Sequence, residues 1–327
     1  MSDYLWDRTG PVDPDVSALE ARLKPLAFTP SALPLPPARE VRRPLRFIVR
    51  LALAASIFLV AGLYGFHTWR LSWPDGRAWQ VDRGASSLAP GSALTADDDG
   101  LRVAIARLGE LEARPGTRLT LVSTTAERHR LALDRGEIDV RVWAPPGRVV
   151  VTTPAGSVVD LGCIFRLTVD EDQATRLRVS TGWVMLDNAY GEQSVPAGAS
   201  SEMRHDRAPS VAVYDDATEA FRRAVREVEA TAHAPVPALI QVVTSEARVR
   251  DAFTVITLAR IDELPPATRA ALLERVSVLH APPSPDAITR ILEGDDDMYW
   301  QWHDSLPLPA LKNWWANWSD IFPRRLR

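Results

Sequence analysis

The fold is decided by the stretch VVVTTPAGSVVDLGCIFRLTV, residues 149–169. β-Branched and apolar residues dominate three short runs within it, Val149–Thr153, Ser157–Leu161 and Phe165–Val169. Ala155-Gly156 separates the first two runs, and a glycine at such a point is typical of a tight turn between strands. Because the runs are too short and too closely spaced for helices, the stretch predicts consecutive β-strands.

The same pattern continues on both sides of this stretch, from about Trp79 to Val213. In EIDVRVW, residues 137–143, every second residue is apolar, which indicates a strand with one buried and one solvated face. Further turns are predicted at Asp99-Gly100, Pro115-Gly116, Arg135-Gly136, Pro146-Gly147 and Thr181-Gly182. A strand about every ten residues predicts an all-β domain over residues 79–213, as a sandwich, a barrel or a short solenoid.

The hydrophobic period changes after Asp215, and residues 215–327 are predicted to form an all-α domain. Helical spacing of apolar residues, bounded by prolines, occurs in 217–233, 250–261, 266–280 and 284–292. A small helical core is also the expected place for the tryptophans Trp300, Trp302, Trp314, Trp315 and Trp318. No fixed repeat period is evident, although paired helices stacked as in HEAT repeats are compatible with the pattern.

Residues 47–66, FIVRLALAASIFLVAGLYGF, form an apolar run in which Arg50 is the single charged residue. About 20 such residues match the hydrocarbon thickness of a bilayer. A signal peptide is disfavoured by the long segment before the run and by the lack of an A-x-A site after it. A core helix would show a polar stripe, which this run lacks. The run therefore predicts one transmembrane helix.

Charges on the two sides of this run predict its orientation. Basic residues precede it at Arg39, Arg42, Arg43 and Arg46, whereas the nearest ones after it are Arg70 and Arg77. Because positive charge favours the cytoplasmic side, the N-terminus is predicted to be cytoplasmic and most of the chain to lie outside. In a bacterium this describes a single-pass inner-membrane protein with a periplasmic domain.

The cytoplasmic piece has two predicted parts, a helical segment over residues 1–28 and a Pro/Arg-rich linker over 29–46. Asp13-Pro14 is typical of an N-cap followed by the first helical residue. One apolar stripe follows at three- and four-residue steps, formed by Val16, Leu19, Leu23 and Leu26. So short a helix has no core of its own, and we expect its stripe to need a partner; the alternative is a frayed tail.

Composition and motifs argue against nucleic acid binding, a disulfide framework and a calcium site. The chain is 46% apolar and 24% charged with a formal net charge of −4, and no strongly basic domain stands out, so we expect no direct binding of nucleic acid. Its one cysteine, Cys163, excludes a disulfide framework and is expected to be an inert core residue. The acidic runs Asp97–Asp99 and Asp295–Asp297 fit no calcium loop and are expected to be solvated turns.

Catalytic signatures are also absent from the sequence. It contains no G-x-S-x-G motif and no phosphate-binding loop, and its scattered histidines lack the spacing of zinc ligands. We therefore expect no catalytic residue, no metal site and no cofactor, and we expect that the protein is not an enzyme.

Together with RLRVSTGWVML (176–186) and SVPAGASSEM (194–203), the opening stretch resembles the FecR-type periplasmic signalling domain. In that family one strand ends in Thr-Pro before a Gly turn, the next ends in Leu-Gly-Thr-x-Phe, and V-x-x-G-x-V and a late Ala-Gly follow. The matching fold-signature residues are Thr153, Pro154, Gly156, Leu161, Gly162, Phe165, Gly182 and Gly198. The departure is Cys163 where the family usually has Thr, a residue of similar size.

The resemblance covers roughly residues 90–205 and implies a function. FecR-type proteins are single-pass inner-membrane regulators whose cytoplasmic segment binds an extracytoplasmic-function sigma factor, often through a helix that carries Trp. On that pattern the surface for the sigma factor would consist of Tyr4, Leu5, Trp6, Val16, Leu19 and Leu23. An unknown periplasmic protein or ligand would supply the signal. The iron-uptake members add a C-terminal domain that meets a transporter, whereas the C-terminus here is predicted to be helical.

A second function is compatible with the same sequence. It is a membrane-anchored periplasmic protein-interaction scaffold without a transcriptional role. The regulator and the scaffold differ in whether the cytoplasmic helix binds a partner.

Overall fold

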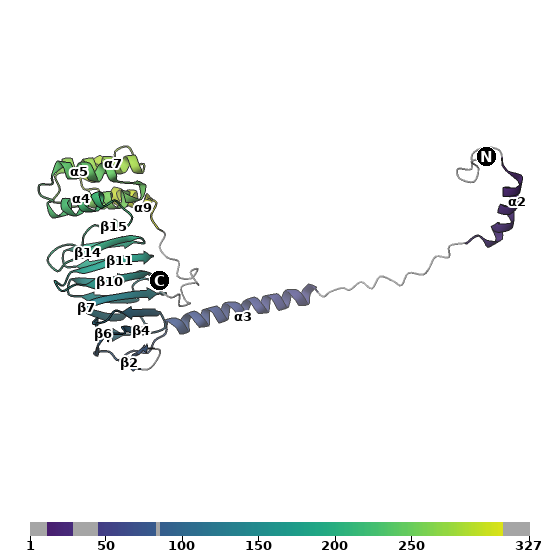
Figure 1. Cartoon of the computed structure of the whole chain (residues 1–327), viewed down its shortest axis with the longest axis horizontal. Helices are drawn as coiled ribbons and strands as arrows, with labels where there is room; N and C mark the ends of the chain where they lie inside the picture. The colour runs from purple at the N-terminus through teal and green to yellow at the C-terminus, as the bar shows by residue number, and fades with distance from the viewer. Residues whose placement is uncertain (1–11, 29–44, 83–85, 310–327) are drawn as a thin grey trace. The chain divides into compact units, whose positions relative to one another are not determined.

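The computed structural model describes residues 12–28, 45–82 and 86–309 (Figure 1). The chain divides into two units, Met1–Val60 and Ala61–Arg327. In the first unit helix α2 covers Pro14–Leu23 and is followed by a 3-10 turn, η1, at Lys24–Leu26.

The start of α2 confirms the N-cap predicted from the sequence. The Asp13 carboxylate accepts a hydrogen bond from the Asp15 N–H at 2.9 Å, and Pro14 occupies the first helical turn. An N-cap oxygen satisfies a helical N–H that has no partner within the helix, and proline fits there because it has no N–H to satisfy.

Helix α3 covers Leu45–Leu71 and contains the predicted apolar run. Its portion Val49–Leu71 is long and apolar enough to cross a membrane. The side chains from Val49 to Phe66 are exposed, which is the arrangement that a helix surrounded by lipid requires. The helix continues beyond Phe66, the predicted end of the span, because no helix breaker occurs before Pro74.

The strands of the second unit form two sheets that share strand β7. Sheet A has the order β2-β1-β4-β5-β7-β10-β11-β14-β15, and sheet B has the order β3-β6-β7-β8-β9-β12-β13. The bounds are β1 Trp79–Val81, β2 Ser86–Leu88, β3 Ala93–Thr95, β4 Leu101–Ile105, β5 Gly109–Ala113, β6 Arg118–Thr124, β7 His129–Val142, β8 Val149–Thr153, β9 Gly156–Asp160, β10 Ile164–Val169, β11 Thr175–Thr181, β12 Trp183–Asn188, β13 Gly191–Pro196, β14 Ala199–Met203 and β15 Val213–Tyr214. Strands β7 and β8 are parallel, and the other named pairs of the described chain are antiparallel.

Strand β7 crosses from one sheet to the other. Residues 129–135 pair with β6 and β8 in sheet B, and residues 136–142 pair with β5 and β10 in sheet A. The turn predicted at Arg135-Gly136 is therefore wrong, because Gly136 with φ +97° bends a continuous strand instead of ending it. Only a residue that tolerates positive φ can make this bend without strain.

The corner at Gly136 is closed by Thr117. A Cβ atom on Gly136 would lie 2.6 Å from the Thr117 Cα, so no larger residue fits there. The Thr117 hydroxyl donates to the Glu137 carbonyl at 3.0 Å and accepts from the Glu137 N–H at 3.1 Å. These bonds satisfy backbone groups next to the bend.

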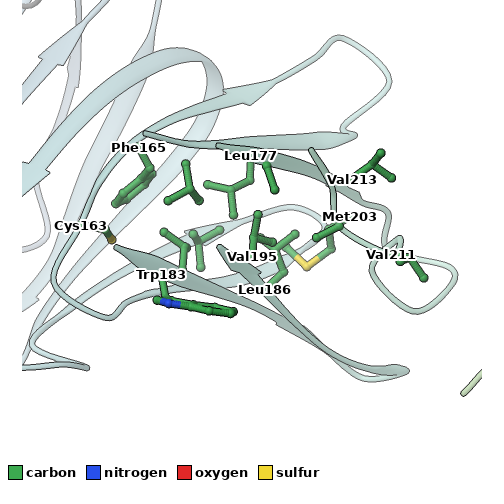
Figure 2. Packing of buried hydrophobic residues seen from close by; sticks show 14 of the residues in the cluster. Cys163, Phe165, Leu177, Trp183, Leu186, Val195, Met203, Val211 and Val213 are labelled. Atoms are coloured by element: carbon green, nitrogen blue, oxygen red, sulfur yellow. The ribbon is translucent and has the colours of Figure 1, made fainter. Parts of the chain in front are cut away.

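The core of the β domain lies between the two sheets. Figure 2 shows Phe165 and Leu177 from sheet A on one side, facing Trp183 and Leu186 from sheet B. The apolar positions predicted in residues 137–143 are buried, namely Ile138, Val140 and Val142, but Arg141 is buried as well, so the opposite face is not solvated at that end of the strand. Each fully buried large apolar side chain stabilises the fold by roughly 2 kcal/mol.

The helical region after the sheets consists of α4 Glu219–Ala230, α5 Pro237–Glu246, η3 Val249–Asp251, α6 Ala252–Leu258, α7 Pro266–Leu279, α8 Ala287–Leu292 and α9 Asp296–Ser305. Helices α5 and α9 were not predicted. The acidic run at 295–297 starts α9 instead of forming a solvated turn, because the Asp295 carboxylate caps the helix by accepting from the Met298 N–H at 3.0 Å.

The helices pack directly on the last strands, and one hydrophobic cluster runs through both regions. The Thr254 hydroxyl of α6 donates to the Ala212 carbonyl at 2.8 Å, and the Val211 N–H donates to the Glu229 carboxylate at 2.5 Å. The Arg250 guanidinium lies 4.0 Å from the centre of the Tyr214 ring on β15. The change from strands to helices therefore occurs without a break in the core.

Replacing Gly136 by alanine is expected to destabilise the β core by about 2–4 kcal/mol. The new methyl group would meet the Thr117 backbone, and alanine is strained at this φ. The matched control is Gly116→Ala, because Gly116 has φ +76° but nothing lies within 4 Å of its Cβ position. The free energy of unfolding of this control should fall by only about 1 kcal/mol. Thermal unfolding of the full chain, followed by circular dichroism, measures the stability of both variants. An equal loss of stability in the two would show that the contact between Gly136 and Thr117 does not stabilise the fold.

Candidate functional site

The end of helix α3 is fastened to the β domain by an arginine on the turn between β4 and β5. The Arg107 Nη1 donates to the Trp69 carbonyl at 2.7 Å and to the Ser72 carbonyl at 2.9 Å. Its guanidinium also lies 4.3 Å from the centre of the Trp69 ring. Carbonyls at a helix C-terminus lack partners within the helix, and a cation there is favoured by the helix dipole.

A second arginine, on the helix itself, makes the reciprocal contact. The Arg70 guanidinium stacks 3.8 Å from the centre of the Trp143 ring, directly after the end of β7. Its Nη2 lies 3.5 Å from the carbonyl oxygens of Leu108 and Trp143. We call the set of Trp69, Arg70, Arg107 and Trp143 the helix joint.

The segment after α3 is held as well. Trp73 is buried, and its Nε1 donates to the Arg77 carbonyl at 3.1 Å. The Arg77 guanidinium lies 4.9 Å from the centre of the Trp73 ring. Trp73 also belongs to the hydrophobic core cluster, and the Arg107 guanidinium lies 5.6 Å from the centre of its ring, so this segment packs against the β domain.

A buried histidine lies at the start of β7. The His129 side chain is 1% exposed, its Nδ1 lies 2.6 Å from the Thr124 hydroxyl, and its ring centre lies 5.8 Å from that of Trp79. Burial, with a smaller contribution from the positive charge of Arg148, lowers the pKa of His129 to about 4. The imidazole is therefore neutral at neutral pH and serves as a packing group.

The helix joint fastens the end of α3 to the β domain. It consists of guanidinium groups, backbone carbonyls and indole rings, which bind one another and hold two elements in one position. Within the described ranges no group of three or more His, Cys, Asp or Glu side chains could hold a metal ion.

The residues predicted to bind a cytoplasmic partner fall into two groups. Val16, Leu19 and Leu23 lie on α2, where no side chain is buried and Leu19 and Leu23 are 56% and 52% exposed. Tyr4, Leu5 and Trp6 lie outside the described residues. Together with Leu26 on η1, which is 78% exposed, the three α2 residues are the residues of the predicted apolar stripe, and among the described residues none of them is buried.

The predicted signature residues occupy strand ends and turns of the β domain, and Phe165 is buried in the core. They are Thr153, Pro154, Gly156, Leu161, Gly162, Phe165, Gly182 and Gly198. Gly182 has φ +78°, and a Cβ there would lie 2.7 Å from the Gly162 carbonyl oxygen. The turn before β10 and the turn before β12 therefore pack against each other. The Thr175 hydroxyl donates to the Thr153 hydroxyl at 2.8 Å and joins β11 to β8.

Cys163 lies in the core beside a buried carboxylate. Its side chain is 0% exposed, its N–H donates to Asp160 Oδ1 at 2.9 Å, and its Sγ contacts the same oxygen. A threonine hydroxyl at this position would present a donor to the same carboxylate, which explains how either residue type suits the site.

Sequence reasoning missed the helix joint. Leu101–Leu108 has the pattern of one continuous strand, but β4 ends at Ile105 and Ala106 turns the chain with φ +47°. Arg107 therefore lies on a turn and reaches Ser72, which is 35 residues away in the sequence. No periodicity or motif connects residues so far apart, although an excess of Trp and Arg after an apolar run was visible.

Comparisons with known proteins give little support for a specific family. No family model and no curated protein matches the chain. It is similar to two crystal structures, at 1.65 and 2.50 Å resolution, of a putative anti-sigma factor from Parabacteroides distasonis ATCC 8503. Each has 16% sequence identity and covers 48% of this chain and 63% of the other, with TM-scores of 0.29 and 0.28. Likenesses this weak carry no argument about function.

Arg107→Ala is expected to loosen the end of α3 while leaving the β core folded. The substitution removes two charge-assisted hydrogen bonds and the contact with Trp69. Amide hydrogen exchange at residues 69–73 should become roughly tenfold faster, which corresponds to about 1.4 kcal/mol. The control is Arg102→Ala on β4, which removes a neighbouring guanidinium that pairs with Glu112 instead. Equal exchange in the two variants would show that Arg107 does not hold the helix.

Protonation of His129 is expected to weaken the fold as the pH falls from about 6.5 to about 4. The unfolded chain takes up this proton near pH 6.5 and the folded chain only near pH 4. The free energy of unfolding therefore falls by about 3 kcal/mol across this window. His129→Gln should flatten this part of a plot of thermal midpoint against pH.

The native protein and the His129→Gln variant serve as controls for each other. Burial raises the pKa of Glu229 to about 7, and this group stabilises the fold as the pH falls. Because Glu229 is present in both proteins, its effect cancels in the difference between their curves. Parallel curves would mean that His129 does not set the acid sensitivity.

Proposed function

We propose that this protein is a single-pass inner-membrane signal transducer similar to FecR-type regulators. A periplasmic sensor domain would control an extracytoplasmic-function sigma factor through the cytoplasmic N-terminus. The observation that carries the proposal is the helix joint, in which Arg107 and Arg70 fasten the end of a membrane-length helix to the β domain. A movement of that domain must then be shared by the end of α3.

The signal would begin with a periplasmic protein or ligand that binds the β or helical region. Such a partner can shift the domain only by binding two conformations with different affinity. A single helix transmits small changes poorly, so the output would be a change in assembly or cleavage of the anchor. The proposal needs no catalytic residue, cofactor or metal in this chain, and no direct contact with nucleic acid.

The solvent-accessible apolar stripe of α2 supports a protein partner on the cytoplasmic side. A helix of this length is marginal alone in water, and the exposed Leu19 and Leu23 offer an apolar face of the kind that enters a groove on another protein. Burial of two or three leucine side chains in such a groove provides several kcal/mol of binding free energy before the ordering cost of the helix is subtracted.

The test is binding of residues 1–45 to the purified extracytoplasmic-function sigma factors of the host. One of them should bind, and Trp6→Ala or Leu19→Ala should weaken that binding at least about tenfold by removing a large apolar contact. The same substitutions in the full chain should change the transcripts that depend on that sigma factor.

The matched control is Ser17→Ala, an exposed position on α2 outside the apolar stripe, and it should leave binding unchanged. If the peptide is soluble and binds none of the sigma factors, the regulator proposal fails. The alternative function, a periplasmic scaffold without a transcriptional role, would then be favoured.

A further inference from the structure

An open pocket of about 640 Å³ lies where the β6–β7 hairpin meets the loop before β8. Its lining includes three arginines, Arg128, Arg130 and Arg148, and one acidic residue, Glu127. Pro146, Gly147 and the hydroxyl-bearing residues Ser123 and Thr125 complete the lining. The lining therefore carries more positive than negative charge and offers many hydrogen-bond donors.

The three guanidinium groups have no acidic partner within the part of the chain that the structure describes. Most arginines on the two sheets form ion pairs, for example Arg166 with Asp139 at 2.8 Å and Arg178 with Asp215 at 2.7 Å. Arg148 instead donates from Nη1 to the Ala126 carbonyl at 2.7 Å, which fixes the loop before β8 against the hairpin. Arg128 and Arg130 are exposed.

The pocket lies close to the end of α3. The Gly76 N–H donates to the Thr124 carbonyl at 3.0 Å, and the Ala126 N–H donates to the Asp75 carboxylate at 3.1 Å. Asp75 follows Leu71, the last residue of α3, by four positions, which an extended chain spans in at most about 14 Å. The headgroup layer extends roughly 6 Å beyond the hydrocarbon, and charges act over about 10 Å in physiological salt.

We propose that this pocket binds the phosphate of an anionic phospholipid headgroup at the outer surface of the membrane that α3 crosses, an inference that rests on the proposed membrane-spanning role of α3. Guanidinium groups suit phosphate because their N–H donors match its oxygens in pairs. Each arginine at an anionic surface strengthens the association by about fivefold. The lipid is the favoured source of phosphate because the hairpin that lines the pocket is hydrogen-bonded to residues 75 and 76, which follow closely after the helix proposed to cross the membrane.

Lipid binding there would give the β domain a second point of attachment. The helix joint holds the domain at Trp69–Ser72, whereas the pocket lies on the hairpin that starts β7. Two attachments limit the tilt of a domain that a single helix would leave free to swing. Arginines inside a translocated domain do not oppose the predicted orientation, because the charge rule counts short flanking segments.

The test is hydrogen exchange of the full chain in nanodiscs of phosphatidylcholine alone or mixed with phosphatidylglycerol. Amides of residues 123–130 and 146–148 should exchange more slowly in the anionic discs, by about fivefold for each guanidinium that engages a headgroup. Arg128→Gln with Arg130→Gln should remove most of this difference. Arg148 stays native because its bond to Ala126 holds the loop.

Two further variants make the result specific. Glu127→Gln removes the acidic residue of the lining and should increase the protection, a gain that misfolding could not produce. Arg223→Gln is the matched control, because Arg223 is exposed on α4, outside the pocket lining, and should change nothing. Raised salt should weaken the protection in the native chain.

The contrary outcomes are distinct. Equal exchange in both lipids, with α3 still protected, would overturn the headgroup site and leave the proposed function intact. Equal protection by inorganic phosphate in phosphatidylcholine discs would show a site for a soluble anion instead of a lipid. Fast exchange throughout α3 in every disc would show that the helix is not inserted, and both proposals would fail together.

Discussion

The bend of β7 at Gly136 is the constraint on which the rest of the structure depends. One strand supplies a central position to both sheets, so sheet A and sheet B are joined by a covalent backbone as well as by the core between them. The bend is possible because Gly136 tolerates positive φ and because the Thr117 hydroxyl pairs with the backbone next to it. Loss of the corner would disturb pairs on both sides of β7 at once.

The same strand connects the corner to the contacts around the end of α3. Its first residue, His129, lies beside Trp79 and next to the arginine-lined pocket, and Trp143 directly after its end stacks on Arg70. Both ends of β7 are therefore tied to the segment that leaves α3. The β domain and the end of α3 are therefore joined at both ends of one strand.

The helical region extends this continuity to the other end of the β domain. Thr254, Glu229 and Arg250 contact residues 211–214, so the helices are joined to the last strands by direct side-chain contacts. Sequence reasoning expected a separate all-α domain from residue 215. The helix that starts at Pro266 was predicted, whereas α5 and α9 were not.

Sequence by itself determined the features that depend on local chemistry. The apolar run of α3, the Asp13-Pro14 start of α2 and the strand alternation at 137–143 each follow from neighbouring residues. Only the tertiary structure decided that Gly136 bends a strand, that Arg107 fastens Trp69 and Ser72, and that unpaired arginines meet near the end of α3. The reason is physical: a glycine has the same freedom in a turn and in a bend, and a guanidinium binds whatever carbonyl or phosphate the fold brings to it. Such partners are set by contacts between residues distant in the chain, which no local pattern records.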